Sequence, residues 1–366
     1  MNELRWETRL LVLVTVILTV LGIASLYAAA TLERDAFGFF TRQFLGAAVG
    51  IVGLVIAGRI DYQRWRTWAW PLLLVTLGLL VIPLLPFTRS ISPPINGARR
   101  WIDVGPVNLQ PSEAARFAVA VWVAMLAAKK GAAIRGFKKG VAPFLVVLGL
   151  MGLLILLEPN LSMAVLVALI GGTVLFTAGA KIGHFLLIAT VGAVGALSLI
   201  WAEPYRLTRL RCFLEPCGEG SFQLDQALLG MGSGGLFGVG FGHGQLKLHY
   251  LPYAYSDFLM STIGEEWGFL GVVVVVLLFA VFGWLGFRIA KTAPDPFGQY
   301  LAAGLTSAVA VAAVLHMGVT MGLLPTTGLA LPFMSYGRSG LIMSLVSVGV
   351  LVSIGRARGR PIKREK

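Results

Sequence analysis

Three carboxylates stand where the longest polar interval of the chain meets a new apolar segment. Asp257 lies at the junction, and Glu265 and Glu266 follow about two turns later. Asp257 could cap the helix that begins there, as could Ser256. Alternatively, Asp257 could be a general base that takes a proton from an attacking hydroxyl. The local sequence leaves both interpretations of Asp257 open.

Glu265 and Glu266 lie inside an apolar segment, where a charged carboxylate is costly to desolvate. At least one of them must therefore face the interior of the protein or a watery cavity, paired with a cation. We predict a structural or auxiliary role for both, with direct substrate contact as the alternative. Glu158, at a tight turn before Pro159 and Asn160, is assigned to the same class.

A second polar interval places Arg99, Arg100 and Trp101 side by side. Tryptophan is typical of a membrane interface, and the planar guanidinium group suits phosphate. Lipid-headgroup contact and substrate-phosphate binding are therefore both open for the arginines. Beyond them, Glu113 and Arg116 are spaced i,i+3 at a predicted helix start, which favours a structural ion pair. All five residues are candidates for substrate binding.

The interval 203–256 contains three more candidate anion ligands, Arg206, Arg209 and Lys247, and a glycine-rich stretch at 230–244. Such a stretch can bring backbone N–H groups to a phosphate. Its glycines can equally let a re-entrant backbone pack closely between helices. No Gly-Lys-Ser/Thr triplet follows and no βαβ unit precedes, so neither a Walker loop nor a dinucleotide fingerprint is indicated.

The remaining candidate groups give no further catalytic constellation. The two cysteines, Cys212 and Cys217, could form a disulfide or remain two free thiols. The four histidines do not cluster with them as metal ligands, and no Ser–His–Asp arrangement is evident.

These residues must be positioned by membrane helices, because 57% of the 366 residues are hydrophobic and only 13% are charged. Spanning a bilayer takes about 20 apolar residues per helix, and long non-alternating runs argue against transmembrane strands. The first apolar segment is too long for a signal-peptide core, so we expect a retained helix. Ten helices are predicted, at 10–30, 39–58, 67–85, 111–128, 141–157, 161–178, 184–202, 257–287, 297–323 and 333–354.

The net charge of +13 is explained by membrane topology without nucleic acid. With the N-terminus inside, 19 of the 30 basic residues fall on the cytoplasmic side. The fold class is thus an all-α integral membrane protein, a bundle of ten transmembrane helices with both termini cytoplasmic. We predict a single polytopic domain over 1–366, with a large extracytoplasmic loop at 203–256 between the seventh and eighth helices and a basic cytoplasmic tail at 355–366. Intervals 86–110, 203–256 and 324–332 then meet outside, beside Asp257.

At these residues the chain resembles the SEDS family (shape, elongation, division and sporulation) over nearly its whole length. The matching stretches are GARRWIDVGPVNLQPSE, AEPYRLTRL, ALLGMGSGGLFGVGFGHGQLKLHYLP, SDFLMSTIGEEWGFLG and GLLPTTGLALPFMSYGRSG. AEPYRLTRL and LLPTTGLALP are more similar to the FtsW division branch than to RodA. Ser335, in the last stretch, joins the candidate substrate-binding residues.

The resemblance implies a peptidoglycan glycosyltransferase of the bacterial inner membrane, at the division septum, that polymerises lipid II. It also implies a class B penicillin-binding protein as transpeptidase partner, other divisome membrane proteins and membrane lipid as further contacts, and no nucleic acid. Asp257 matches the family's essential aspartate, which favours the general-base interpretation. One carboxylate suffices, because a pyrophosphate leaving group needs charge stabilisation rather than protonation. Basic residues could supply this charge, or a divalent cation, Mg²⁺ or Mn²⁺, bound with the pyrophosphate; no tightly bound cofactor is expected.

The chain departs from the family pattern at several positions. Tyr253 and Tyr255 replace a glutamate and a histidine before Asp257, and Arg338 replaces a glycine. At the turn after 141–157, Glu158 replaces a glutamine and Asn160 an aspartate. Arg116 replaces a lysine.

Two other functions remain as alternatives. A lipid II flippase or other carrier would also need many helices, but it predicts ion-coupled charges near the bilayer midplane, whereas the polar residues gather at the outer face. A non-catalytic scaffold that activates a partner synthase is the third hypothesis.

Overall fold

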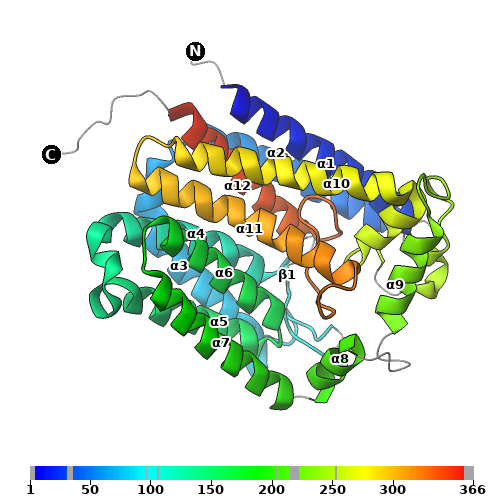
Figure 1. The fold of residues 1–366 in the computed structure, drawn as a ribbon, viewed down its shortest axis with the longest axis horizontal. Helices are drawn as coiled ribbons and strands as arrows, with labels where there is room; N and C mark the ends of the chain where they lie inside the picture. The colour runs from blue at the N-terminus through cyan, green and yellow to red at the C-terminus, as the bar shows by residue number, and fades with distance from the viewer. Residues whose placement is uncertain are drawn as a thin grey trace.

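The structure, a computed structural model, describes residues 5–30, 36–95, 97–104, 107–202, 204–214, 222–251 and 254–357. Helices dominate it (Figure 1). The long helices are α1 (Trp6–Ala30), α2 (Ala36–Arg59), α3 (Gln63–Val81), α4 (Pro111–Lys130), α5 (Ala142–Leu157), α6 (Leu161–Thr177), α7 (Ile182–Ala202), α10 (Leu259–Lys291), α11 (Pro296–Thr320) and α12 (Arg338–Ala357). The short elements are helices α8 (Pro204–Leu214) and α9 (Phe222–Ser233) and the antiparallel pair β1 (Ile102–Val104) and β2 (Val107–Leu109).

A helix occupies each of the ten predicted apolar ranges, but several boundaries were wrong. α10 begins at Leu259 rather than at 257, and α12 begins at Arg338 rather than at 333. In both cases the preceding residues form turns that bond to each other. α12 also runs on to Ala357, into the predicted tail at 355–366.

The interval 203–256, predicted as a large extracytoplasmic loop, has helical structure in its described residues. It contains α8, α9 and a π-helical turn at Leu246–Tyr250. α9 packs against α10 and buries Leu224, Ala227 and Gly230, which share one face at a helical spacing of three residues.

The long helices run between two ends of the molecule, and each end carries its own set of helix termini and connecting segments. α1 begins and α12 ends at the same end, at the left of Figure 1. The opposite end carries β1, α8, α9 and the start of α10 (Figure 1). The segments 86–110, 203–256 and 324–337 thus gather at one end, as the alternating direction of the helices predicted; we refer to it as the Asp257 end.

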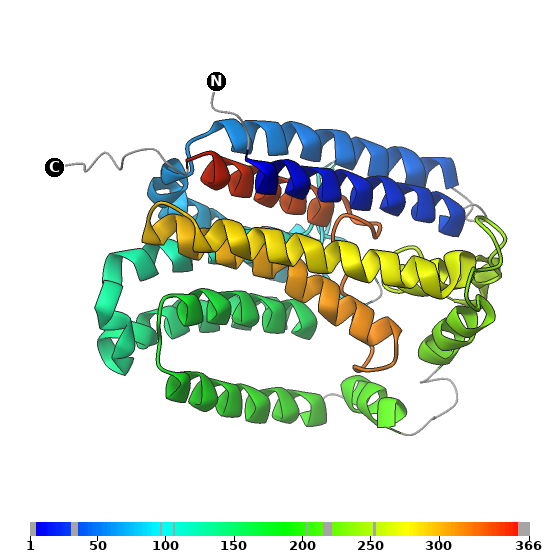
Figure 2. The same ribbon diagram turned by 45° about the horizontal axis from the view of Figure 1, so that its top comes forward.

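Within the described residues, eight helices are long and apolar enough to cross a membrane, while α6 and part of α7 are shorter apolar helices. α4 and α11 form the centre, and most of their residues are buried. α7 lies at the periphery with most of its described side chains exposed (Figure 2). Small residues permit close helix contacts, as is usual in membranes. A Cβ added to Gly349 of α12, for example, would lie 2.4 Å from the backbone oxygen of Leu54 in α2.

Candidate active site

Asp257 lies two residues before the start of α10, half-buried, at the end where the polar segments meet. The helix-cap interpretation is not supported, because the cap position is Phe258 and makes no side-chain cap hydrogen bond. Asp257 faces the segment before α12: a Cβ added to Gly328 would lie 3.5 Å from its Oδ2. The carboxylate therefore lies between the start of α10 and residue 328, with part of its surface open.

The backbone beside Asp257 is fixed by Ser335. Its hydroxyl donates to the backbone oxygen of Ser256 at 2.6 Å and accepts a bond from the backbone N–H of Leu331 at 2.9 Å. The backbone N–H of Tyr336 donates to the oxygen of Tyr255 at 3.1 Å. Ser335 thus holds the Asp257 turn in place; its predicted substrate contact stays a prediction.

Aromatic rings enclose the same turn. The ring centroid of Phe39 in α2 lies 4.9 Å from the ring centroids of both Tyr255 and Tyr336, and the centroids of the two tyrosines are 5.9 Å apart. Aromatic pairs at such spacings stabilise the folded state by more than the burial of their apolar surface alone. Tyr255, at the position where the family pattern has histidine, therefore packs in an aromatic cluster.

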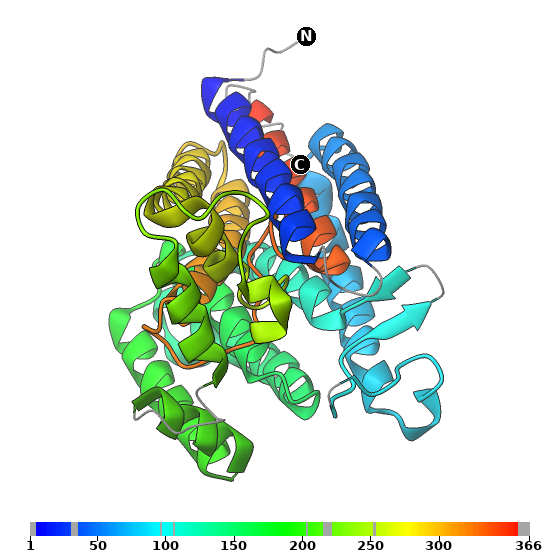
Figure 3. The ribbon, with the colours of Figure 1, turned by 90° about the vertical axis from the view of Figure 1, so that its right-hand side faces the viewer.

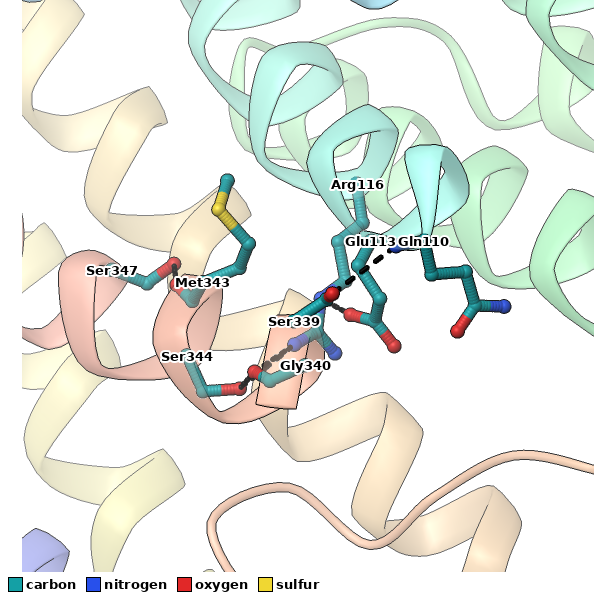
Figure 4. Close-up of polar contacts among 8 residues, drawn as sticks. All are labelled: Gln110, Glu113, Arg116, Ser339, Gly340, Met343, Ser344 and Ser347. Atoms are coloured by element: carbon teal, nitrogen blue, oxygen red, sulfur yellow. Dashed lines mark hydrogen bonds and ion pairs between the residues drawn. The ribbon is translucent and has the colours of Figure 1, made fainter. Parts of the chain in front are cut away.

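Glu113 and Arg116 form the predicted ion pair, buried at the junction of α4 and α12 (Figure 4). Glu113 Oε2 lies 2.8 Å from Arg116 Nε. Arg116 Nη2 also donates to the backbone oxygen of Gly340 at 2.9 Å and to Ser344 Oγ at 2.8 Å. The pair holds the first turn of α12 against α4, which supports a structural role, and the predicted substrate contact of these two residues stays a prediction.

Ser339 extends this junction toward the β-hairpin. Its hydroxyl donates to the backbone oxygen of Asn108 at 2.9 Å. It also accepts from the N–H of Gln110 at 3.1 Å, as Figure 4 shows. β2, α4 and α12 are therefore bonded at one point. The hydrogen bonds of Ser335 and Ser339 make the start of α12 the connection between the Asp257 turn and the Glu113–Arg116 pair.

Arg100 lies at the turn between α5 and α6. Its Nε donates to the backbone oxygen of Glu158 at 2.9 Å, and its Nη2 donates to the oxygen of Pro159. Glu158 is fully buried, and neither carboxylate oxygen has a hydrogen-bond partner among the described residues. Burial raises the pKa of Glu158 to about 8, although the positive charge of Arg100 acts in the opposite direction.

Arg99 points elsewhere than Arg100. Its guanidinium donates to the backbone oxygens of Ser92 and Leu85, each at 2.9 Å, and to Thr88 Oγ1 at 2.8 Å. Arg99 therefore organises its own loop, and its predicted role in phosphate binding gains no support. Trp101 is half-buried before β1.

Glu265 and Glu266 are both buried in the first turns of α10, where they bind the glycine-rich stretch. Glu265 accepts the backbone N–H groups of Gln245 at 2.6 Å and Leu246 at 3.1 Å. Glu266 accepts backbone hydrogen bonds from Gly242 and Gly244 and lies near Lys247. A Cβ on Gly234 would lie 2.1 Å from the oxygen of Gly264. The glycines thus permit close backbone packing, and these N–H groups bind carboxylates of the protein itself.

Other predicted groups are only partly described. Lys247 Nζ donates to the oxygen of Gly242. Arg206 and Arg209 lie in α8, but their side chains are outside the described part of the chain. Cys212 is disulfide-bonded, and Cys217 is outside the described residues, as is Tyr253. No cluster of three or more His, Cys, Asp or Glu occurs in the part that the structure describes.

Sequence reasoning missed two buried residues that hold the segment before α12. Gln43 in α2 donates from Nε2 to the oxygen of Ser335 at 3.1 Å and accepts the N–H of Gly337 at 3.2 Å. His316 in α11 has its Nδ1 2.7 Å from the oxygen of Leu329. The available signal was a lone amide or imidazole within an apolar helix, since such a side chain needs an internal partner.

The fold and the site together define an integral membrane protein built almost entirely of helices, with its polar machinery collected at one end. The family described as cell cycle protein, which comprises FtsW, RodA and SpoVE, matches residues 5–359. The chain therefore belongs to the FtsW/RodA/SpoVE family, and the family prediction is confirmed.

Three relatives illustrate the similarity. Stage V sporulation protein E of Bacillus subtilis is 36% identical, covering 95% of this chain and 96% of its own. The probable peptidoglycan glycosyltransferase FtsW of Trichlorobacter lovleyi is 41% identical, covering 94% and 92%. That of a Geobacter species, strain M18, is 38% identical, covering 98% and 100%. The enzyme class predicted from the sequence is the class named for the last two.

Solved structures show the same fold. A chain from a peptidoglycan synthase complex that coordinates polymerization and crosslinking superposes with a TM-score of 0.81 at 25% identity, covering 99% of this chain and all of the other. The rod shape determining protein RodA of Thermus thermophilus gives a TM-score of 0.71 at 27% identity, covering 96% and 97%.

Proposed function

We propose that this chain is a peptidoglycan glycosyltransferase that polymerises lipid II during cell division, with Asp257 as its general base. The observation that carries the proposal is the placement of Asp257 on a turn fixed by Ser335, at the end where the polar segments gather. Figure 3 views the molecule from this end. The relatives named FtsW support the enzyme class.

The chemistry needs one base and a stabilised leaving group. Asp257 accepts the proton of a sugar hydroxyl as its oxygen bonds to the anomeric carbon of a second lipid-linked sugar. The bond from that carbon to the pyrophosphate oxygen breaks, the configuration inverts, and polyprenyl pyrophosphate leaves as an anion. A base is effective when its oxygen comes within hydrogen-bond reach of the proton it removes.

The cations for the leaving group remain proposals. Arg99 and Arg100 donate to backbone oxygens, so Arg206 and Arg209 in α8 are the more favoured ligands for pyrophosphate. Glu113 and Arg116 hold the start of α12, and through α12 they position the segment that contacts the Asp257 turn. The predicted Mg²⁺ or Mn²⁺ stays a prediction, and we derive no step through it.

For topology, we propose ten membrane spans in one domain over 1–366, with both termini cytoplasmic and the Asp257 end extracytoplasmic. The inner membrane at the division septum is the proposed location. Basic residues concentrate in the segments of the opposite end, including Lys129, Arg135 and Lys138, which supports this orientation.

For partners, we propose lipid II as substrate and a class B penicillin-binding protein as the transpeptidase, together with other divisome membrane proteins. The solved peptidoglycan synthase complex, in which polymerization and crosslinking are coordinated, supports a two-enzyme assembly.

The test is lipid II polymerisation by purified protein with its penicillin-binding partner, comparing wild type with Asp257→Asn. Asp225→Asn, at an aspartate of α9, is the matched control. We expect glycan chains from wild type and from the control but none from Asp257→Asn, provided that melting temperature and partner binding are unchanged.

Two outcomes would count against the proposal. Equal polymerisation by Asp257→Asn would remove this carboxylate as the base. No polymerisation by any partnered preparation would favour the scaffold or the carrier. The buried acids of the described spans already argue against a midplane carrier, since Glu7, Glu113, Glu265 and Glu266 lie near the starts of their helices.

A further inference from the structure

The segment 85–95, between α3 and β1, is held rigidly by its own polar groups. Besides the three bonds from Arg99, the hydroxyl of Thr88 donates to the backbone oxygen of Ile82 at 2.6 Å. The N–H of Ser92 donates to the oxygen of Thr88 at 2.8 Å, and that of Asp103 donates to the oxygen of Ile91 at 2.7 Å. The segment therefore has a defined inner side.

In this segment some polar side chains are buried and large apolar side chains are exposed, which is the opposite of a loop that faces water. Thr88 and Ser92 are buried, whereas Phe87 is 77% exposed, Ile91 42% and Ile95 44%. A loop in water normally turns its polar side chains outward and covers large apolar ones. Here the hydroxyl of Thr88 makes its hydrogen bonds inward, and the outer side presents these three apolar side chains together with the exposed Arg89 and Ser90.

The exposed apolar surface continues from α3. The candidate membrane span that contains α3 ends at Leu84, three residues before Phe87. Its outward side chains include Trp70, 51% exposed, and Leu74 and Val75, each 62% exposed. Since this face of α3 meets lipid in an integral membrane protein, Phe87 prolongs a lipid-facing surface.

The position of the segment fits this continuity. Seen from the Asp257 end, the chain between α3 and β1 lies at the margin of the molecule, away from α10 (Figure 3). Arg89, two residues after Phe87 in the sequence, is exposed, and cationic residues close to aromatic ones are typical of the headgroup region.

We propose that residues 85–95 form a membrane-inserted tip. Phe87, Ile91 and Ile95 enter the boundary between headgroups and acyl chains of the leaflet at the Asp257 end, and Arg89 contacts lipid phosphates. Arg99 acts as the internal brace that keeps these side chains outward. The tip sets the depth and tilt of this end of the bundle relative to lipid, independently of the reaction at Asp257.

The test uses an environment-sensitive fluorophore on Phe87→Cys in the full chain, reconstituted in vesicles of phosphatidylethanolamine and phosphatidylglycerol. Asp103→Cys, at an exposed residue of β1, is the control, and wild type treated with the same dye gives the background. We expect a lipid-borne nitroxide near the headgroups to quench the probe at 87 severalfold more than the probe at 103. Aqueous iodide should show the reverse order.

Arg99→Met tests the brace. Loss of its three hydrogen bonds should reduce lipid quenching at position 87, while Arg135→Met, at an exposed arginine of the opposite end, should leave it unchanged. Iodide quenching at 87 equal to that at 103 would overturn the proposal. A second result would also overturn the proposal: iodide quenches the probe at 87 in the protein alone, but neither quencher reaches it after the penicillin-binding partner is added. The tip would then be a contact with the partner protein.

Discussion

The hydroxyl of Ser335 and the backbone oxygen of Ser256 are 2.6 Å apart, and this bond joins two segments separated by about eighty residues. Ser335 lies three residues before the start of α12, and Ser256 lies directly before Asp257. The position of the proposed base is consequently set by the segment before α12 as well as by its own helix.

Ser335→Ala should lower polymerisation by about 10- to 100-fold, because small misplacement of a reacting group is costly. It also removes one hydrogen bond from each of two backbone groups, at a cost of roughly 1–3 kcal/mol. Ser347→Ala is the control, since the buried hydroxyl of Ser347 bonds only within α12, to Met343. Turnover and melting temperature are measured for both; equal turnover would show that the bond does not position Asp257.

Arg116→Met should destabilise the protein strongly, because it leaves Glu113 buried without its cation, at a cost of about 3–5 kcal/mol. Arg116→Lys retains the charge but cannot reproduce the planar guanidinium, so part of the contact with Gly340 and Ser344 is lost. In thermal unfolding measured in the same detergent, wild type should have the highest melting temperature, Arg116→Lys the next and Arg116→Met the lowest. A Met variant as stable as wild type would contradict the structural role of the pair.

Glu158 makes stability dependent on pH. Its unfolded pKa is near 4.5 and its folded pKa about 8, so the folded state holds the proton longer. The contribution of Glu158 to the free energy of unfolding therefore falls as pH rises between these values and is lowest above pH 8. Glu158→Gln should raise the melting temperature clearly near pH 9 and little near pH 4.5. An equal shift at both pH values would exclude ionisation as the cause.

His316 should tolerate asparagine better than glutamine. A carbonyl oxygen only accepts, so Nδ1 of His316 donates to Leu329, next to the residue that faces Asp257. The amide nitrogen of asparagine can occupy nearly the place of Nδ1, whereas that of glutamine reaches the place of Nε2. We expect His316→Asn to keep most of the kcat and His316→Gln to lose it, with little change in KM. The reverse order would show that Nε2 is the important atom.

Much of the fold follows from hydropathy, because apolar length decides where helices form in a membrane. The spacing of Glu113 and Arg116 likewise predicted their pairing. The short helices α8 and α9 were missed, since neither is long enough to span a membrane and α9 forms against α10.

The individual roles of the polar residues were less accessible. Arg99 and Arg100 are adjacent in sequence and look equivalent, yet one braces its own loop and the other binds the α5–α6 turn. Gln43 and Ser335 are separated by nearly the whole chain. Only the packing of α2 on α12 brings them together, and no local pattern reports such a contact.

Gly268 divides α10 through a left-handed backbone conformation, with φ of 68°. The residues before it, including Glu265 and Glu266, are bonded to the glycine-rich stretch rather than to the membrane helices alone. The residues after it are bonded to the same stretch, because the N–H groups of Phe269 and Leu270 donate to the oxygens of Gly235 and Leu236 at 2.9 and 3.2 Å. The kink of α10 is therefore held by this stretch on both sides, which fixes the direction of the rest of α10 relative to the turns that follow Asp257.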